Sequence, residues 1–412
     1  MRPLVTALVV ALLLPAAAAG KPVPKLRGVS ITNVGTKTAL GDIDTELNAV
    51  KALGANTLRA DISWAGLEPE QGKLDAGYLQ RIDHLIAGAH ARHIKPVLIV
   101  LRSPCWASSA PGAPGTCNAD TLAYPPTDPA TYGSIAGRLA KRYKGRLGGF
   151  EVWNEPDHAN EDYFKGPDKP ARYTAIVKAA YRAIKKSDRS LPVVAGSLVG
   201  SNGAFLEALY QAGMKGFYDG LSVHYYDLTL AAVRAIRRVQ LKHGDHTPLW
   251  LNEFGWTSCW PAKRNEGGHA CVTAKQQASN LSDIFRALNG KSFIRAAIVY
   301  NLRERKGEHF GVITAAGKRK PAFAALRKAF TTGAGRPHRV QAHIGGGRLS
   351  GTAPAGDAVL VQIFKNDGTF LTGTALAPDR FGRFSLKLPS GLRGVRIDVF
   401  QEWTGLKTVL HV

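Results

Sequence analysis

Short apolar runs alternate with amphipathic stretches along the chain from about residue 26 to residue 330. Eight runs have the length and the β-branched composition of buried strands, and they cover 28–31, 57–62, 96–101, 149–153, 193–196, 221–225, 249–252 and 296–300. Segments with the apolar period of a helix follow them, and these cover 43–53, 76–92, 129–143, 171–187, 204–213, 228–243, 273–289 and 319–330.

This alternation predicts an α/β fold in which residues 24–330 form a (β/α)8 barrel. Parallel strands need crossover helices, and strands that are apolar almost throughout need cover on both faces. A doubly wound open sheet is the alternative, but no Gly-x-Gly-x-x-Gly fingerprint supports it.

The character of the chain changes after the last predicted helix. Residues 331–339 are rich in glycine, threonine and proline and predict a linker. Residues 340–412 contain short alternating runs separated by turn residues, which predict a small β-sandwich. Such a domain could bind carbohydrate or serve as a spacer or a structural cap, since Trp403 is its only tryptophan.

The first residues resemble a secretory signal peptide. Arg2 precedes an apolar run at 4–14 and the small residues 16–19, which predicts cleavage near Ala19 and removal of residues 1–19. The run is too short to span a bilayer, and no later stretch is long and apolar enough, so we expect no transmembrane segment after cleavage. The mature protein is therefore expected to be secreted, either extracellular or held in the periplasm or at the cell envelope.

Four cysteines in an exported chain indicate disulfide bonds. Cys105 and Cys117 bracket one loop, and Cys259 and Cys271 bracket another. A barrel places these loops on nearly opposite sides of its mouth, so we expect the two local pairs. A zinc site is the alternative, but the chain has no Cys-x-x-Cys pair.

The chain carries a formal net charge of +23, with 54 Lys and Arg against 31 Asp and Glu. Such a charge favours an anionic partner, such as an acidic polysaccharide or a cell-envelope surface. The basic residues are scattered, however, and a solvated basic surface explains them better than a specific partner does. They form no long run and no aromatic-interleaved motif, so a nucleic-acid partner is not expected.

Two glutamates follow predicted strands: Glu155 in Trp-Asn-Glu-Pro (153–156) and Glu253 in Asn-Glu-Phe-Gly-Trp (252–256). In a (β/α)8 barrel the active site forms where strands end. Cleavage of a glycosidic bond uses two carboxyl groups, one protonated and one ionised. Charged carboxylates at such ends are costly to bury without a purpose, so the pair predicts a glycosidase acting on a carbohydrate substrate.

Further polar and aromatic candidates lie at or just past strand ends: Arg59, Trp64, Trp106, Asn154, His224, Tyr226, Trp256 and Tyr300. Five of the seven tryptophans, namely Trp64, Trp106, Trp153, Trp256 and Trp260, lie in such positions, where their rings could stack on sugars. Any one of these side chains could instead pack in the core or satisfy a buried polar group.

These motifs resemble glycoside hydrolase clan A, nearest to the family 5 cellulase-like and family 39 xylosidase-like enzymes. The resemblance covers nearly the whole barrel, from Leu-Arg-Ala-Asp-Ile-Ser-Trp (58–64) through the two glutamate motifs and His-Tyr-Tyr (224–226) to Gly-Lys-Arg-Lys-Pro-Ala (317–322). It implies a retaining mechanism without a cofactor or metal, acting on O-glycosidic, β-linked bonds.

The resemblance also implies a role for each matching residue. Glu155 resembles the acid/base, Glu253 the nucleophile and Asn154 the group that binds the sugar 2-hydroxyl. Arg59 and Tyr226 resemble supports of the nucleophile, and His224 resembles a contact of the substrate or the acid/base. A guanidinium and a hydroxyl beside Glu253 would favour its charged form and leave the proton on Glu155.

Two departures from the family 5 pattern argue against a plain cellulase and favour a family 39-like or an unassigned branch. The last strand ends at Tyr300 without the usual tryptophan, and the third ends at Pro104 and Trp106 without the usual histidine. The acidic loop Asp157, His158, Glu161 and Asp162 lacks clean metal-ligand spacing, so we expect no metal. A non-catalytic carbohydrate- or envelope-binding barrel, and a transglycosylase that uses the same glutamates, are the alternative functions.

Overall fold

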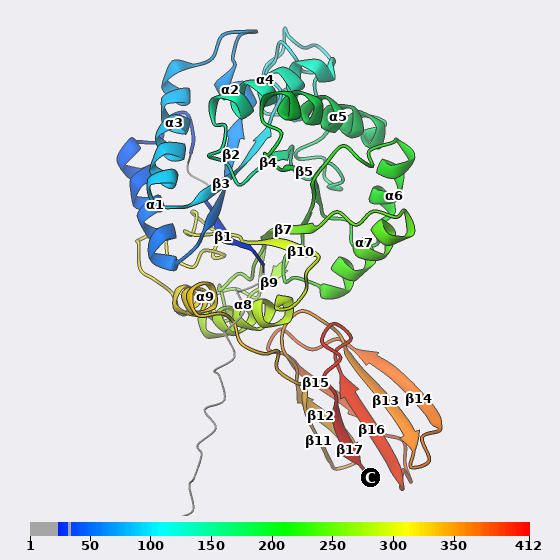
Figure 1. The fold of residues 1–412 in the computed structure, drawn as a ribbon. Helices are drawn as coiled ribbons and strands as arrows, with labels where there is room; N and C mark the ends of the chain where they lie inside the picture. The colour runs from blue at the N-terminus through cyan, green and yellow to red at the C-terminus, as the bar shows by residue number, and fades with distance from the viewer. Residues whose placement is uncertain (1–23, 32–33) are drawn as a thin grey trace, which may run out of the picture.

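The computed structural model describes residues 24–31 and 34–412, so the predicted signal peptide lies outside the described residues. Eight parallel strands close into a barrel in the order β1-β10-β7-β6-β5-β4-β3-β2. Figure 1 shows this barrel with its ring of helices and the C-terminal strands standing apart below it. The barrel strands are β1 (Leu26–Ile31), β2 (Thr57–Ser63), β3 (Lys95–Leu101), β4 (Gly149–Val152), β5 (Val193–Leu198), β6 (Gly220–His224), β7 (Leu249–Phe254) and β10 (Ile294–Val299).

The outer ring is made of helices that follow the strands along the chain. They are α1 (Leu40–Leu53), α3 (Ala76–Ala91), α4 (Pro129–Arg142), α5 (Lys169–Ser187), α6 (Ala204–Gln211), α7 (Leu230–Lys242), α8 (Ala274–Leu288) and α9 (Pro321–Thr331). Local sequence sets their ends: Asp75 accepts from the Tyr78 N–H at the start of α3, and Gly54 ends α1 with a left-handed φ of 76°.

The predicted (β/α)8 barrel is confirmed, with element boundaries that agree within a few residues. The insertions were not predicted, because their residues carry no clear period. They comprise the one-turn helix α2 (Trp64–Leu67), the 3-10 turn Thr121–Ala123 and the hairpin of β8 (Asn265–Glu266) and β9 (His269–Ala270). The hairpin follows β7, so it stands at the carboxyl end of the barrel.

The seven remaining strands form two antiparallel sheets, which confirms the predicted β-sandwich. One sheet has the order β11-β12-β15 and the other β14-β13-β16-β17. The strands are β11 (Gln341–Gly345), β12 (Arg348–Thr352), β13 (Val359–Lys365), β14 (Phe370–Leu376), β15 (Arg383–Lys387), β16 (Val395–Phe400) and β17 (Thr408–His411). Alternate residues such as Val359, Val361 and Ile363 point inward and form a core separate from that of the barrel.

The β-sandwich is held against helices α7 and α8 of the barrel by polar and aromatic contacts. Arg234 on α7 forms an ion pair of 2.6 Å with Asp357. The Trp403 indole donates to the Ala287 carbonyl at the end of α8, over 2.8 Å. Trp403 is therefore used at this junction, where its ring also packs against Phe293.

Both predicted disulfides are confirmed. Cys105 is bonded to Cys117 and Cys259 to Cys271, with Cα atoms 5.6 and 5.0 Å apart. Each bond closes a loop at the carboxyl end of the barrel. Among the helices that the structure describes, none has the length and hydropathy required to cross a bilayer.

Candidate active site

A cleft of about 780 Å³ opens at the carboxyl ends of the barrel strands. Glu155, Glu253, Asn154, His224, Tyr226 and Tyr300, all predicted from the sequence, line it. The two glutamates come from opposite walls, because Glu155 follows β4 and Glu253 lies on β7. Only 7 and 8 % of their surfaces are exposed. Burying two carboxyls costs free energy unless charged or polar partners compensate for the lost water.

Glu253 has such partners on both oxygens. The Arg59 Nη1 lies 3.0 Å from its Oε2, and the Tyr226 hydroxyl donates to its Oε1. The structure thus brings together the three residues that the resemblance linked. Both contacts favour the ionised carboxylate, since one supplies positive charge and the other a hydrogen bond.

Arg59 is itself buried at the centre of the site, with 2 % of its surface exposed. Its Nε donates to Glu151 over 2.6 Å, and its Nη2 donates to the Asn154 Oδ1 over 2.9 Å. Burial alone would lower the pKa of Arg59. The negative charges of the surrounding carboxylates, of which Glu151 has the largest effect, outweigh burial, so the pKa of Arg59 is raised above its usual value. Arg59 therefore stays charged and fixes Asn154 and Glu253 in one orientation.

Glu151, a buried carboxylate within β4, was not selected from the sequence. Ser197 and Ser222 donate to its Oε1 over 2.7 and 2.8 Å, and Arg59 occupies its Oε2. Burial raises the pKa of Glu151, yet the charges of Arg59 and nearby His224 hold it well below its usual range. One feature of the sequence could have identified Glu151: it is the only charged residue in an apolar strand. A buried carboxylate needs a buried cation as its partner.

His224 connects the carboxyl groups. Its Nδ1 lies 3.1 Å from Glu155 and 3.7 Å from Glu253, and its Nε2 lies 3.6 Å from Glu151. Burial by itself lowers the pKa of His224, but the charge of Glu253 and the contacts with Glu151 and Glu155 raise it to about 9. At neutral pH the imidazole is protonated, and its Nδ1–H donates to Glu155.

The two cleft glutamates titrate as a coupled pair. Burial raises the pKa of Glu253 in spite of the charges of His224 and Arg59. Burial acts on Glu155 in the same direction, but the hydrogen bond and charge of His224 outweigh it and lower the pKa of Glu155. In the substrate-free cleft the mobile proton therefore resides on His224 and not on Glu155. The sequence predicts that His224 contacts the substrate or the acid/base but does not assign it the proton.

The backbone around Glu155 is held in an uncommon conformation. Trp153 and Glu155 have left-handed φ angles of 63° and 43°. Such a conformation costs about 1–3 kcal/mol for each residue that is not glycine, and it clusters at functional sites. Packing around the Trp153 ring, which is completely buried and donates to the Tyr163 carbonyl over 2.8 Å, opposes relaxation.

The prediction that tryptophan rings line the cleft is wrong. Trp64 and Trp153 are fully buried, and Trp64 packs edge-on against Trp106 while it donates to Glu68. Trp106 is half-buried and donates to the Glu68 carbonyl, so it supports the same wall. Trp256 lies away from the cleft and lines a neighbouring cavity. A flat ring at a strand end can face inward, because burying it stabilises the fold.

Other rings and charges line the cleft instead: Asp61 lies on β2, and most of the others come from loops that carry no periodic signal. They are Asp61, His158, Tyr163, Tyr225, His269, Arg305, Glu308 and Phe310. Tyr226 packs against Tyr300 and Phe310, so the predicted Tyr300 belongs to an aromatic cluster beside Glu253. The Tyr300 hydroxyl donates to Glu308 over 3.0 Å.

Glu155, His224 and Glu253 each present a possible metal ligand, with the three atoms within 4.8 Å of one another. Arg59 and Tyr226 already occupy the oxygens of Glu253, and two positive side chains stand beside the group. Bound cations are disfavoured beside such charges. On the acidic loop, Asp157 accepts from the Val199 and Gly200 N–H groups, which gives this carboxylate a structural role.

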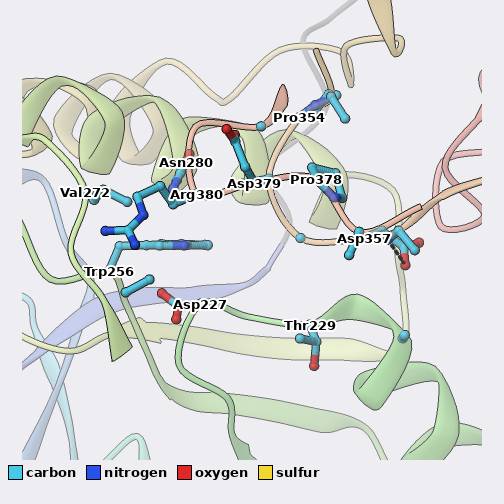
Figure 2. A pocket seen from close by; sticks show the side chains of 18 residues that line it. Asp227, Thr229, Trp256, Val272, Asn280, Pro354, Asp357, Pro378, Asp379 and Arg380 are labelled. Atoms are coloured by element: carbon cyan, nitrogen blue, oxygen red, sulfur yellow. Dashed lines mark hydrogen bonds between the residues drawn. The ribbon is translucent and has the colours of Figure 1, made fainter. Parts of the chain in front are cut away.

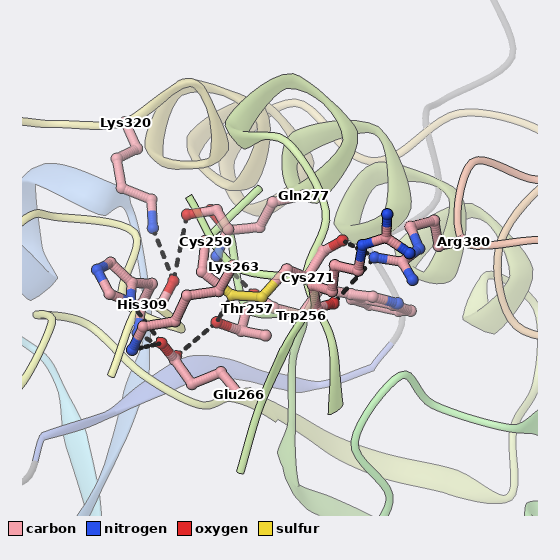
Figure 3. Close-up of a disulfide and its surroundings, with 12 residues drawn as sticks. Trp256, Thr257, Cys259, Lys263, Glu266, Cys271, Gln277, His309, Lys320 and Arg380 are labelled. Atoms are coloured by element: carbon pink, nitrogen blue, oxygen red, sulfur yellow. Dashed lines mark hydrogen bonds and ion pairs between the residues drawn. A yellow bond between two sulfur atoms is a disulfide. The ribbon is translucent and has the colours of Figure 1, made fainter. Parts of the chain in front are cut away.

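The second disulfide stabilises one wall of the cleft (Figure 3). Glu266 of the β8–β9 hairpin accepts from Thr257 over 2.6 Å and from the His309 N–H over 2.7 Å. The Cys259–Cys271 bond crosses the same loop. Glu266, Gly267 and His269 of this hairpin face the cleft.

Comparison with known sequences identifies the family. The model of the family described as Cellulase (glycosyl hydrolase family 5) matches residues 16–281. The chain belongs to glycosyl hydrolase family 5. This family 5 protein is accordingly a glycosidase with a clan A barrel. No curated protein matches it significantly.

Solved structures share the fold of this family 5 protein at low identity. A family 39 glycoside hydrolase from the gut symbiont Bacteroides cellulosilyticus WH2 has 16 % identity and a TM-score of 0.59, over 93 % of this chain and 81 % of that chain. The GH39 enzyme from Xanthomonas axonopodis pv. citri has 16 % identity and a TM-score of 0.58, over 93 and 96 %. A GH39 β-xylosidase from Caulobacter crescentus has 17 % identity and a TM-score of 0.53, over 93 and 98 %. The predicted likeness to both families is confirmed.

Proposed function

We propose that this protein is a secreted retaining glycosidase that cleaves β-linked O-glycosidic bonds in oligo- or polysaccharides by double displacement. The distance between the carboxyl groups of Glu155 and Glu253 carries the proposal. One oxygen of Glu155 lies within 4.8 Å of one oxygen of Glu253. Retaining glycosidases hold their carboxyls about 5–5.5 Å apart, whereas inverting enzymes need about 6.5–9.5 Å for a water molecule.

In the first step Glu253 attacks the anomeric carbon and the bond to the leaving oxygen breaks, while Glu155 protonates that oxygen. Arg59 and Tyr226 orient the attacking carboxylate through the contacts described. In the second step Glu155 takes a proton from water, whose oxygen displaces Glu253 and restores the carboxylate. No redox partner is required, because each step exchanges one C–O bond for another.

His224 supplies the proton that the first step consumes. Its Nδ1 lies 3.1 Å from Glu155, so the proton passes to Glu155 when a sugar displaces water from the cleft and disfavours separated charges. Glu253 stays ionised in the complex because Arg59 remains 3.0 Å away. Asn154, fixed by Arg59, binds the sugar 2-hydroxyl in this scheme.

The test is hydrolysis by the mature chain of a panel of neutral and acidic glycans, with product stereochemistry followed by NMR. Glu253→Gln and Glu155→Gln should each reduce turnover by about 10⁴-fold or more, while exposed Glu70→Gln leaves it unchanged. The first-formed product should keep the anomeric configuration of the substrate. An inverted product would overturn the retaining mechanism, and full activity of both variants would overturn the site. Formation of larger glycosides instead of reducing ends would indicate transglycosylation.

The basic charge has a possible docking place at the opposite end of the barrel. A cavity of about 1010 Å³ there is lined by Lys25, Arg27, Arg237, His246 and Arg295, and none of the described residues that line it carries a carboxylate. This supports a secondary interaction with an acidic polysaccharide or envelope polymer. Export is supported by the two disulfide bonds. Binding to an acidic glycan that did not weaken with added salt would contradict the electrostatic interaction.

A further inference from the structure

A second cavity lies between the barrel and the β-sandwich, and we call it the interdomain cavity. It has a volume of about 470 Å³. Thr229, Ala231, Trp256 and Val272 form part of its barrel side, and residues 353–358, 377–380 and 382 form its sandwich side. Figure 2 shows Trp256 and Arg380 together at one end and Pro354, Pro378 and Asp357 toward the other. Its size lies within the range of small-ligand pockets.

The interdomain cavity is built on a rigid junction. The Leu230 N–H donates to the Gly356 carbonyl over 2.6 Å, so the start of α7 is bonded to the sandwich. Gly356 has a φ of 110°, and a Cβ there would lie 2.6 Å from Ile284 of α8. Only glycine permits this close approach. The junction thus fixes both walls without a ligand.

Contacts of Arg380 fix the end of the interdomain cavity that lies near Trp256. Arg380 of the sandwich donates to the Arg264 carbonyl over 2.9 Å and stacks on Trp260, 5.3 Å from the ring centroid. Both contacts are to the loop that the Cys259–Cys271 bond closes. Through Arg380, the sandwich therefore contacts the same loop that forms one wall of the cleft (Figure 3).

The interdomain cavity and the catalytic cleft lie on two sides of one thin ridge. Thr229 lines both cavities. Along the chain Tyr226 faces the cleft while Asp227 faces the interdomain cavity, and likewise His269 faces the cleft while Ala270 faces the cavity. Asp227 and His269 approach to 3.7 Å across the ridge. A chain molecule in the cleft thus needs to cross only this ridge to enter the cavity.

The chemistry of the cavity suits a sugar ring. Eight of its eighteen lining residues are alanine or proline, and their side chains can contact the C–H faces of a sugar. Asp227 supplies polarity: about a third of its side chain (35 %) is exposed, and its Oδ2 lies 3.7 Å from the His269 Nδ1. Figure 2 places this carboxylate beside the Trp256 ring. The exposed part of this carboxylate can accept a hydrogen bond from a sugar hydroxyl.

We propose that the interdomain cavity is a subsite for a distal sugar unit of the glycan whose scissile bond lies between Glu155 and Glu253. The substrate class is then an extended glycan and not a single terminal sugar on a small aglycone. The β-sandwich contributes eleven of the eighteen lining residues of this subsite and so acts in substrate binding. This inference rests on the proposed glycosidase function and adds chain length to it.

The test places a large side chain in the interdomain cavity, first from the barrel side and then from the sandwich side. Ala231 and Ala377 are exposed alanines that line it, one on the barrel and one on the sandwich. Ala231→Trp and Ala377→Trp should each lower kcat/KM for a long oligosaccharide about 10-fold or more, which corresponds to about 1.4 kcal/mol. Their kcat/KM for a short chromogenic glycoside should stay within about 2-fold of wild type. Ala87→Trp, at an exposed position of α3, is the matched control.

The outcomes separate this inference from the proposed function. Unchanged rates on the long substrate in both variants, or equal losses on long and short substrates, would overturn the subsite. A wild-type enzyme that cleaves the short glycoside with no preference for longer chains would also overturn it and leave the glycosidase intact. A wild-type enzyme that cleaves neither the short glycoside nor the long oligosaccharide would overturn both the subsite and the proposed glycosidase function. A preference for an apolar aglycone in place of a longer glycan would assign the cavity to a different occupant and overturn the proposal.

Discussion

The guanidinium of Arg59 contacts Glu253 at 3.0 Å while the same group holds Glu151 at 2.6 Å. One cation therefore neutralises charge at the reacting carboxylate and at a deeper one. Two buried carboxylates around one arginine leave a net negative charge that His224 balances. The order of the site depends on this arrangement more than on any single hydrogen bond.

Arg59→Lys keeps the positive charge but cannot reach Glu151, Glu253 and Asn154 together, since an ammonium group lacks the planar fork. We expect kcat to fall about 100-fold or more and the free energy of unfolding to fall by about 2 kcal/mol. Steady-state kinetics and urea unfolding measure these losses. Arg303→Lys is the control, because Arg303 pairs with Glu46 outside the cleft. Equal effects of the two substitutions would contradict a special role for Arg59.

Tyr226→Phe removes the hydrogen bond to Glu253 but keeps the ring that packs on Tyr300. Loss of a donor to the carboxylate raises the pKa of Glu253, so the acidic limb of the kcat/KM profile should move to higher pH. We expect a 10- to 100-fold lower rate, by analogy with the loss of other charge-stabilising donors, about 10²-fold. Tyr225→Phe, which also lines the cleft, should leave the acidic limb in place. A profile that shifted equally in both variants would rule out the specific contact.

His224 makes folding stability dependent on pH. Its pKa is raised from 6.5 to about 9 in the folded protein. The stabilisation is therefore complete below about pH 6.5 and is lost as the pH rises through about 9, with a maximum of about 3 kcal/mol. Urea unfolding at pH 6 and at pH 10 should show this decline in wild type. His224→Gln should flatten it, and an unaltered decline in that variant would assign the effect to other groups.

The two disulfides close loops of equal sequence separation, 12 residues each. Replacing either pair by serine should lower the free energy of unfolding by about 3 kcal/mol in the chain-entropy description. Only the Cys259/Cys271 replacement should also lower kcat/KM, because that loop carries Glu266 and His269 into the cleft. Thermal unfolding and kinetics of both double variants test this. A comparable kinetic loss in the Cys105/Cys117 variant would contradict it.

Sequence predicted the barrel well because β-branched runs and the helical period repeat with few interruptions. It also selected Glu155 and Glu253, since a carboxylate directly after an apolar strand has few structural explanations. It misplaced Trp64, because an aromatic residue at a strand end carries no information on which way its ring points. Tyr163 and Phe310 were missed because their loops are brought to the cleft only by tertiary packing.

Five residues separate His224 of the cleft from Leu230, whose N–H is bonded to the Gly356 carbonyl of the β-sandwich. This short tether carries Tyr226 and Asp227 between the nucleophile and the second domain. Any displacement of the sandwich would be transmitted along it to the hydroxyl that orients Glu253. In the proposed mechanism the sandwich is therefore part of the scaffold that holds Tyr226 beside Glu253, and exchanging the sandwich between enzymes would require redesign of this tether.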